Sequence, residues 1–153
     1  YLPSLSRVKR IASNNKSGAF MGSEFAFEDI SSQEVEKFSY RYLKDEQLDG
    51  QDCTVVEQIP TYANSGYSKQ LVWRDKAEYR IQKIDYYDKR NELLKTVRLY
   101  DYKRHLDRFW YPDRWEMVNH KTGRSTSLLM QNYKLGNGFT ARDFDQSSLS
   151  RTR

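Results

Sequence analysis

The pattern of apolar and polar residues changes at short, regular intervals from residue 40 onward. Runs rich in Val, Ile, Thr, Tyr and Trp alternate with breaks rich in Asp, Asn, Gly and Lys, which is typical of strands joined by turns. Asp49-Gly50 is the strongest turn signal, because Asp-Gly suits a two-residue hairpin loop. The sequence therefore predicts an antiparallel meander of seven strands, plus an eighth at residues 7–13; the seven are residues 40–47, 51–59, 68–75, 79–88, 93–103, 109–118 and 124–135.

Alternation within these strands is clear in some places and lost in others. Trp115 and Met117 lie opposite the charged residues of "RWEMV", and Leu71 and Trp73 share one face of "QLVWR". Residues 93–102, in contrast, carry apolar side chains on both faces. Since a sheet with one solvated face alternates cleanly, this blurring predicts a strongly curved sheet with parts of both faces covered.

Two short helical segments are expected outside the strands. A capping box that begins at Ser31 predicts a short helix near residues 32–38. A similar pattern at Thr140 predicts a helical turn, with Phe144 and Leu149 as its apolar anchors. Neither segment adds a second layer of helices, so the fold class is mainly β.

Composition indicates one globular domain with a small or open core. We expect a single domain over residues 1–153, and hydrophobic residues make up only 37% of it. The net charge of +5 is spread along the chain rather than clustered, which favours a solvated face. The single cysteine, Cys53, is expected to be a small buried hydrophobe. The chain starts without Met and as if inside a strand, so we expect an N-terminal segment upstream of it.

No catalytic or metal-binding pattern is found in the sequence. His105 and His120 both fall in predicted turns without a second ligand at workable spacing, so we interpret them as solvated turn residues. A Gly-rich phosphate loop, a nucleophile elbow and a Cys pair are all missing from the sequence. We therefore predict no enzyme, no metal and no cofactor, and expect four strand carboxylates to pair with Lys or Arg: Asp85, Asp88, Asp101 and Glu116.

Nucleic-acid binding is one alternative that the basic charge raises. Residues 95–111 interleave cationic and aromatic side chains, as in barrels whose aromatic residues stack on bases. Acidic residues interrupt this strip, and Tyr is common on strand surfaces. We therefore predict no nucleic-acid partner.

The apolar loop at residues 14–29 is the most unusual feature of the chain. Asn, Ser and Gly alternate there with Phe20, Met21, Phe25 and Phe27, although loops are normally polar. In one interpretation these side chains close the core. In the other they form a movable flap over a concavity that the sheet leaves unfilled. The two interpretations are compatible, and the sequence alone leaves both open.

Several long stretches resemble the outer-membrane lipoprotein-sorting protein family. Residues 1–31, 65–103, 110–130 and 138–151 carry this resemblance, which covers nearly the whole chain. The resemblance implies a fold like that of the periplasmic lipoprotein carriers of the LolA/LolB-like superfamily. That fold is an unclosed half β-barrel, a curved antiparallel meander whose apolar concave side is covered by a short helix and loops.

The resemblance also implies a function. We expect a non-catalytic periplasmic carrier that holds lipoprotein acyl chains or another lipid. An interaction module that docks on a membrane exporter of the resistance-nodulation-division type is the alternative, since some family members accompany such exporters. Arg74, Lys69 and Arg98 are candidates for contact with a lipid headgroup. The expected ligand-binding residues are Phe20, Met21, Phe25, Phe27, Leu71, Trp73, Val97, Leu99, Trp115, Met117, Leu128 and Met130.

Overall fold

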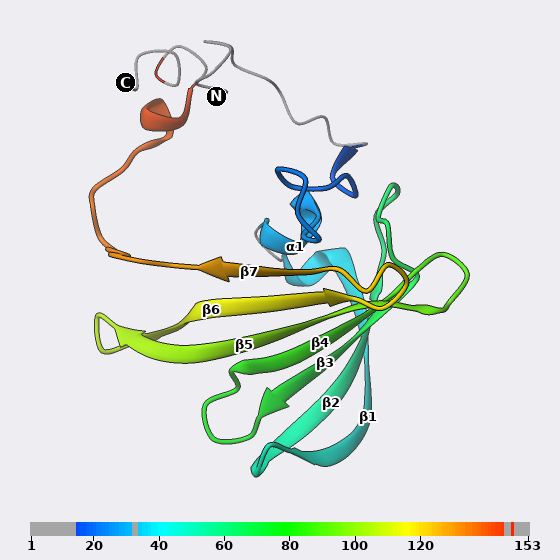
Figure 1. The fold of residues 1–153 in the computed structure, drawn as a ribbon. Helices are drawn as coiled ribbons and strands as arrows, with labels where there is room; N and C mark the ends of the chain where they lie inside the picture. Colours follow the sequence, from blue (N-terminus) through cyan, green and yellow to red (C-terminus); the bar gives the residue numbers. More distant parts are fainter. Residues whose placement is uncertain (1–14, 32–33, 146–147, 149–153) are drawn as a thin grey trace.

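The computed structural model describes residues 15–31, 34–145 and 148, and its fold is a single open sheet (Figure 1). Seven antiparallel strands follow one another in the order β1 to β7, which confirms the predicted meander. The eighth strand expected at residues 7–13 lies outside the described residues. The strands are β1 Phe38–Leu48, β2 Gln51–Pro60, β3 Lys69–Asp75, β4 Ile81–Tyr87, β5 Leu93–His105, β6 Phe109–Asn119 and β7 Ser125–Leu129.

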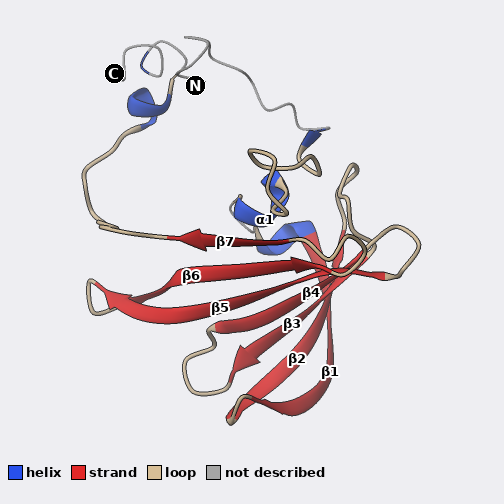
Figure 2. Ribbon diagram, viewed as in Figure 1, coloured by secondary structure: helices blue, strands red, loops and turns tan. Residues whose placement is uncertain are grey.

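The sheet is curved and does not close into a barrel. Each strand pairs with its neighbours in sequence, and no pairing joins β1 to β7 within the described part of the chain. The register shifts at three places, between Tyr42 and Lys44, at Trp73/Arg74 and at Tyr86/Tyr87. Such irregularities bend a strand and increase its twist, and Figure 2 shows the strands fanning out and bending along the sheet. The predicted half-barrel architecture is confirmed.

The β1–β2 turn has the geometry that its sequence predicts. Leu48 and Gln51 are register partners, so only Asp49 and Gly50 lie between the strands. Both residues have positive φ, 51° at Asp49 and 79° at Gly50, as a type I′ turn requires. Glycine adopts this backbone conformation without strain, which explains its place in the turn.

The short helix predicted near residues 32–38 is confirmed in part: a 3-10 helix lies within this range, but it does not begin at the Ser31 capping box. Ser31 has extended backbone angles and ends α1 (Phe27–Ile30) instead of opening a new helix. Its hydroxyl donates to the carbonyl oxygen of Glu28, so it interacts with the preceding turn. Only the short 3-10 helix η3 (Val35–Lys37) follows, because strand β1 begins directly after it and leaves no room for a longer helix.

The C-terminal turn is confirmed, but its expected anchoring is not. A capping box formed by Thr140 and Asp143 opens η4 (Ala141–Phe144), as predicted. Phe144 is 68% exposed and has its ring edge against Phe139, which is also exposed, so it does not anchor η4 in the core. Leu149 lies outside the described residues. Strand β7 also ends earlier than expected, because pairing with β6 stops at Leu129.

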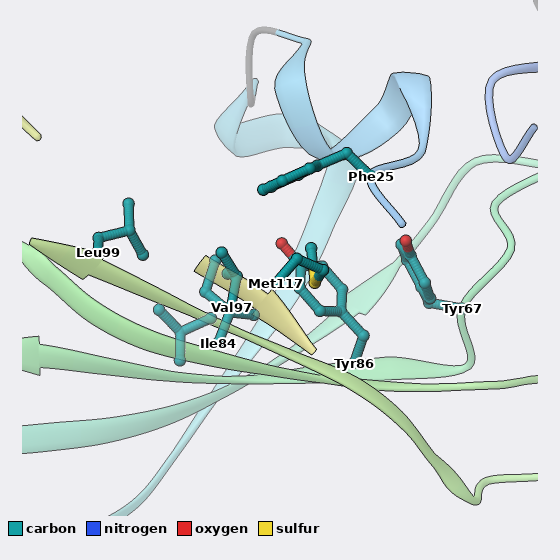
Figure 3. Packing of buried hydrophobic residues seen from close by; sticks show 8 residues of the cluster. Phe25, Tyr67, Ile84, Tyr86, Val97, Leu99 and Met117 are labelled. Atoms are coloured by element: carbon teal, nitrogen blue, oxygen red, sulfur yellow. The ribbon is translucent and has the colours of Figure 1, made fainter. Parts of the chain in front are cut away.

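Two apolar clusters lie on opposite faces of the sheet. The inner face carries a row of register partners from β3 to β6, formed by Val72, Ile84, Val97 and Met117. Successive residues of a strand point to opposite faces, so the smaller cluster around Trp73 belongs to the outer face. Figure 3 shows the inner-face residues gathered below Phe25, which comes from the segment before β1.

The segment of residues 15–31, here called the covering segment, is held on the inner face by polar contacts as well as by the apolar packing of Phe25. Lys95 Nζ lies 2.6 Å from Asp29 Oδ2 and donates to the carbonyl oxygen of Glu24 at 3.0 Å. The hydroxyl of Tyr67 donates to Asp29 Oδ1 at 2.6 Å. Glu28 accepts hydrogen bonds from Tyr62, Ser65 and the backbone of Gly66. These contacts hold α1 against β5 and the connection between β2 and β3, and that position shapes the space beside it.

Candidate functional site

A cavity of about 500 Å³ lies on the inner face beside the C-terminal end of α1. Its floor is apolar and consists of side chains from β4, β5 and β6, with Ile84, Val97 and Leu99 at the centre and Trp115 beside them. Residues 29–31 of the covering segment form one wall. The turns β3–β4 and β5–β6 supply the rest of the boundary. The cavity is thus a concave apolar surface between the sheet and its cover.

The rim of the cavity is aromatic and cationic. The guanidinium carbon of Arg80 lies 5.4 Å from the ring centroid of Tyr102 and 4.9 Å from that of Trp110. Arg80 Nε also donates to Asp75 Oδ2 at 2.9 Å, so its charge is compensated. The indole nitrogen of Trp110 donates to Glu78 Oε2 at 3.0 Å. These contacts fix flat rings around an opening that an extended apolar chain can enter.

Two ionisable groups at the rim, Tyr102 and Asp75, are held in single protonation states near neutral pH. Burial raises the pKa of Tyr102 well above its usual range, and its hydroxyl donates to the carbonyl oxygen of Ile81. Burial also disfavours the charged form of Asp75, but hydrogen bonds from the Glu78 backbone, Arg80 and Gln82 outweigh it and lower the pKa of Asp75. At these two positions the rim therefore offers a neutral phenol and a carboxylate rather than a group that titrates near neutral pH.

Five of the sequence-predicted ligand residues that come from the strands lie on the inner face, as the cavity does. Val97, Leu99 and Trp115 line the cavity itself. Met117 is fully buried in the inner-face cluster next to them, and Leu128 packs against that cluster. Three predicted residues thus line the concavity, and two lie beside it.

The phenylalanines of the covering segment belong mostly to the core. Phe25 is only 1% exposed, and its ring centroid lies 6.3 Å from that of Trp115. Phe20 packs against the same cluster and meets Phe27 edge-on at 5.6 Å between centroids. The position of Phe25 corresponds to the interpretation in which these side chains close the core. Met21 points away from it and is 77% exposed, so it does not face the interior as expected.

Three further predicted ligand residues lie elsewhere. Leu71 and Trp73 do share a face, but it is the outer face, where they pack with Cys53 and Val55. The run Leu-Val-Trp is apolar at every position, so its alternation cannot distinguish the inner face from the outer. Met130 follows the last residue of β7 and therefore lies outside the sheet. It lines a separate depression beside β5 and β6.

Only one of the three candidate headgroup contacts lies on the inner face. Lys69 is on the outer face, where its ammonium lies 3.7 Å from Glu57. Arg98 is also on the outer face and forms an ion pair with Asp49 in the β1–β2 turn. Arg74 is the register partner of Ile81, which lines the cavity, and it therefore belongs to the inner face.

His120 is an exposed turn residue, as predicted, but the same prediction is wrong for His105, which is the half-buried last residue of β5. The ring of His105 meets Tyr133 edge-on, and Nε2 of His120 lies 2.8 Å from the hydroxyl of Thr96. No group of three metal-ligating side chains occurs among the residues that the structure describes. The four strand carboxylates pair as expected: Asp85 with Lys83, Asp88 with Lys121, and both Asp101 and Glu116 with Arg114.

The strip at residues 95–111 does not form one cationic surface. Within β5, successive side chains alternate between the two faces, so Val97 and Leu99 line the cavity while Arg98 lies on the opposite side. Lys95 is buried against Asp29. This distribution is unsuited to a continuous basic path along a nucleic-acid backbone.

Sequence reasoning missed several residues of the cavity. Ile81 and Ile84 lie in a predicted strand but were not assigned to a site. Their spacing of three residues would place them on opposite faces of a regular strand, and the register shift at Trp73/Arg74 allows both to line the cavity. Tyr102 and Trp110 come from the β5–β6 hairpin and reach the cavity only because the sheet curves. No local signal in the sequence distinguishes these two rings from ordinary aromatic residues on strands.

Comparison with known proteins adds an evolutionary relationship to this geometry. Residues 1–151 match the sequence model of a protein family whose description is "Uncharacterized protein". The chain belongs to this family. A search of curated proteins gave no match. Within the described part of the chain, no helix is both long and apolar enough to cross a membrane.

Solved structures confirm the predicted resemblance. An outer membrane lipoprotein-sorting protein domain from Vibrio parahaemolyticus is 52% identical, with a TM-score of 0.94 over 99% of this chain and 64% of that chain. A DUF1329 family protein from Desulfovibrio piger is 29% identical, with a TM-score of 0.89 over 97% and 62% of the two chains. A LolA superfamily protein from Nitrosomonas europaea, at 24% identity and a TM-score of 0.77 over 96% and 65%, shares the fold. The chain thus spans slightly less than two thirds of the length of each of these relatives.

Proposed function

We propose that this protein binds the acyl chain of a lipid or lipoprotein in the inner-face cavity and acts as a non-catalytic periplasmic carrier. The observation that carries the proposal is the cavity itself, an open space of about 500 Å³ over an apolar floor. This size is within the usual range of ligand-binding cavities, roughly 300–1,000 Å³. The similarity to a lipoprotein-sorting domain supports both the ligand class and the periplasmic location.

Such binding requires no directional interactions such as hydrogen bonds, because apolar burial alone supplies the affinity. Each methylene group that leaves water for an apolar surface contributes about 0.8 kcal/mol. The floor residues Ile84, Val97 and Leu99 offer only hydrocarbon surface, and the indole ring of Trp115 extends it. Affinity then depends on the length of the bound chain rather than on its detailed structure. A carrier benefits from this property because it can release the same ligand to a more apolar acceptor.

The proposal is tested with a neutral single-chain lipid, 1-monolauroylglycerol, added below its critical micelle concentration. Trp110 and Trp115 both line the cavity, so tryptophan fluorescence reports occupancy directly. The cavity variant is Ile81→Glu, which places a charge at the half-buried edge of the floor. The matched control is Leu71→Glu, at a half-buried apolar position on the outer face.

We expect saturable binding to the wild-type protein and to Leu71→Glu, and an affinity roughly tenfold or more lower for Ile81→Glu, because a charge next to an apolar ligand must lose hydration. Circular dichroism checks that both variants keep their sheet. A wild-type protein that shows no saturable binding would disprove the proposal. So would an equal loss of affinity in both variants.

A further inference from the structure

Arg74 lies on the inner face directly beyond the cavity. It is the register partner of Ile81, which lines the cavity, and of Thr54 on the other side. Neighbouring strands are about 4.8 Å apart, so the Arg74 side chain starts one strand away from the cavity floor. The side chain is half-buried. A ligand that fills the cavity and extends along the inner face toward β2 therefore meets the Arg74 side chain.

The charge of Arg74 has no partner in the part of the chain that the structure describes. No carboxylate there forms an ion pair or a hydrogen bond with its guanidinium, whereas Arg41, Arg80, Arg98 and Arg114 each pair with an acidic residue. Buried cations are normally paired, because removing a charge from water costs free energy. Burial lowers the pKa of Arg74, yet a guanidinium stays charged near neutral pH.

The neighbours of Arg74 do not neutralise it. Tyr40 and Tyr102 are the ionisable groups near enough to interact with its charge. Tyr102 is a neutral phenol whose hydroxyl already donates to the carbonyl oxygen of Ile81. The Tyr40 hydroxyl donates to the carbonyl oxygen of Val35, so both hydroxyls are engaged with backbone carbonyl groups rather than with the guanidinium.

The charges of the cavity itself show a similar imbalance. Of its two carboxylates, Asp29 is neutralised by Lys95 and Glu78 accepts the indole N–H of Trp110. Arg108 also lines the cavity; its guanidinium carbon lies 5.1 Å from the ring centroid of its neighbour, Phe109.

Like Arg74, Arg108 has no acidic partner within residues 15–31 and 34–145. Arg80, the remaining guanidinium at the rim, is compensated by Asp75. Two cations without an acidic partner among these residues, Arg74 and Arg108, therefore lie around the apolar cavity, and Arg74 is half-buried. Glu78 is the one carboxylate at the cavity that has no cationic partner among the same residues.

We propose that Arg74 binds the acidic headgroup of an amphiphile whose acyl chain occupies the cavity. This inference rests on the function proposed above and narrows its ligand class to lipids with a phosphate or carboxylate head. A guanidinium and a phosphate or carboxylate form two parallel charge-assisted hydrogen bonds, and partial burial strengthens them. The apolar floor would hold the chain, while Arg74 would fix which end of the ligand leaves the cavity at β3.

The test compares two amphiphiles with the same chain length and different charge. Dodecyl phosphate is the anionic probe and 1-monolauroylglycerol the neutral one, both followed by tryptophan fluorescence at low ionic strength. The variants are Arg74→Gln, which removes the charge, and Arg74→Lys, which keeps it without the two-pronged geometry. Arg98→Gln is the matched control, because Arg98 is a half-exposed strand arginine on the outer face.

We expect the wild-type protein and Arg98→Gln to prefer dodecyl phosphate by roughly tenfold or more, Arg74→Gln to lose this preference, and Arg74→Lys to keep part of it. Affinity for the neutral probe should change less than twofold in every variant. Equal affinity of the wild-type protein for the two probes overturns the inference and leaves the proposed function standing. Failure to bind either probe refutes the proposed function itself.

Inorganic phosphate distinguishes a headgroup site from a site for a free anion. If Arg74 recognises a headgroup, phosphate at tenfold excess over dodecyl phosphate should displace almost none of it, because the acyl chain supplies most of the affinity. Equal affinities for the two anions would overturn the proposal. If Arg74→Gln does not fold, Arg74→Lys decides the test. Its preference for dodecyl phosphate over 1-monolauroylglycerol must then be smaller than that of the wild-type protein.

Discussion

Replacing Lys95 by Met should detach the covering segment from the inner face. Lys95 Nζ lies 2.6 Å from Asp29 Oδ2, and both side chains are almost fully buried, at 6% and 1% exposed. The substitution keeps the length of the side chain but leaves the Asp29 carboxylate without a counter-ion. Removing one partner of a buried ion pair typically costs about 3–5 kcal/mol. Asp29 keeps hydrogen bonds from the hydroxyl of Tyr67 and the backbone of Ala26, so we expect a loss of about 3 kcal/mol.

The assay is a double-mutant cycle by urea denaturation, with Lys95→Met, Asp29→Asn and the double variant. The double variant contains neither buried charge, so it should cost less free energy of unfolding than the sum of the two single variants. Hydrogen exchange at residues 26–30 would show whether the covering segment opens on its own, before the sheet unfolds. Lys76→Met is the control, because Lys76 and Asp45 form an exposed pair whose removal should not change stability measurably.

Two results would refute this reasoning. One is a Lys95→Met protein whose free energy of unfolding lies within about 0.5 kcal/mol of the wild type, since that would show that the buried carboxylate needs no cation. The other is strict additivity of the two single variants, which would mean that Lys95 and Asp29 do not stabilise each other.

Two further predictions concern the core and the acid range. Phe25→Ala should lower the free energy of unfolding in urea by about 3–5 kcal/mol, whereas Met21→Ala should leave it nearly unchanged; equal effects would contradict the burial of Phe25. Asp75 has a lowered pKa in the folded state, so its contribution to stability is present above about pH 4 and decreases as the pH falls through the folded-state value. Asp75→Asn should therefore have a flatter stability profile between pH 6 and pH 3. Parallel profiles for Asp75→Asn and the wild type would count against this assignment.

The sequence predicted the strands well because the signals for strands and turns are local. Asp49-Gly50 marks a tight hairpin, and the structure has it with positive φ at both residues. Alternation at Trp115 and Met117 also placed both residues correctly on one face. The helix near residues 32–38 is shorter than predicted and does not begin at Ser31, because the capping signal is local and does not account for the start of β1 at Phe38.

The candidate site could be predicted only in part. The covered face of the sheet, and the contacts between residues far apart in the sequence, depend on the tertiary structure. Leu71 and Trp73 share a face, but an uninterrupted apolar run contains no information about which face is covered. The sequence marked Phe25 as unusual. Its burial, however, depends on contact with Trp115, which lies 90 residues later in the sequence. Charge pairing between residues far apart in sequence is equally invisible to patterns read along the chain.

By itself, the sequence determined the fold class, the succession of strands and turns, and the family, because these depend on residue types at short spacing and on long ordered motifs. Only the tertiary structure decided which apolar residues line the cavity, that Lys95 pairs with Asp29, and that Arg74 lies on the inner face with no acidic partner among the described residues. These facts follow from the curvature of the sheet and from the covering segment that lies on it. Both bring together residues that are distant in the chain, and a pattern over neighbouring residues does not indicate such long-range contacts.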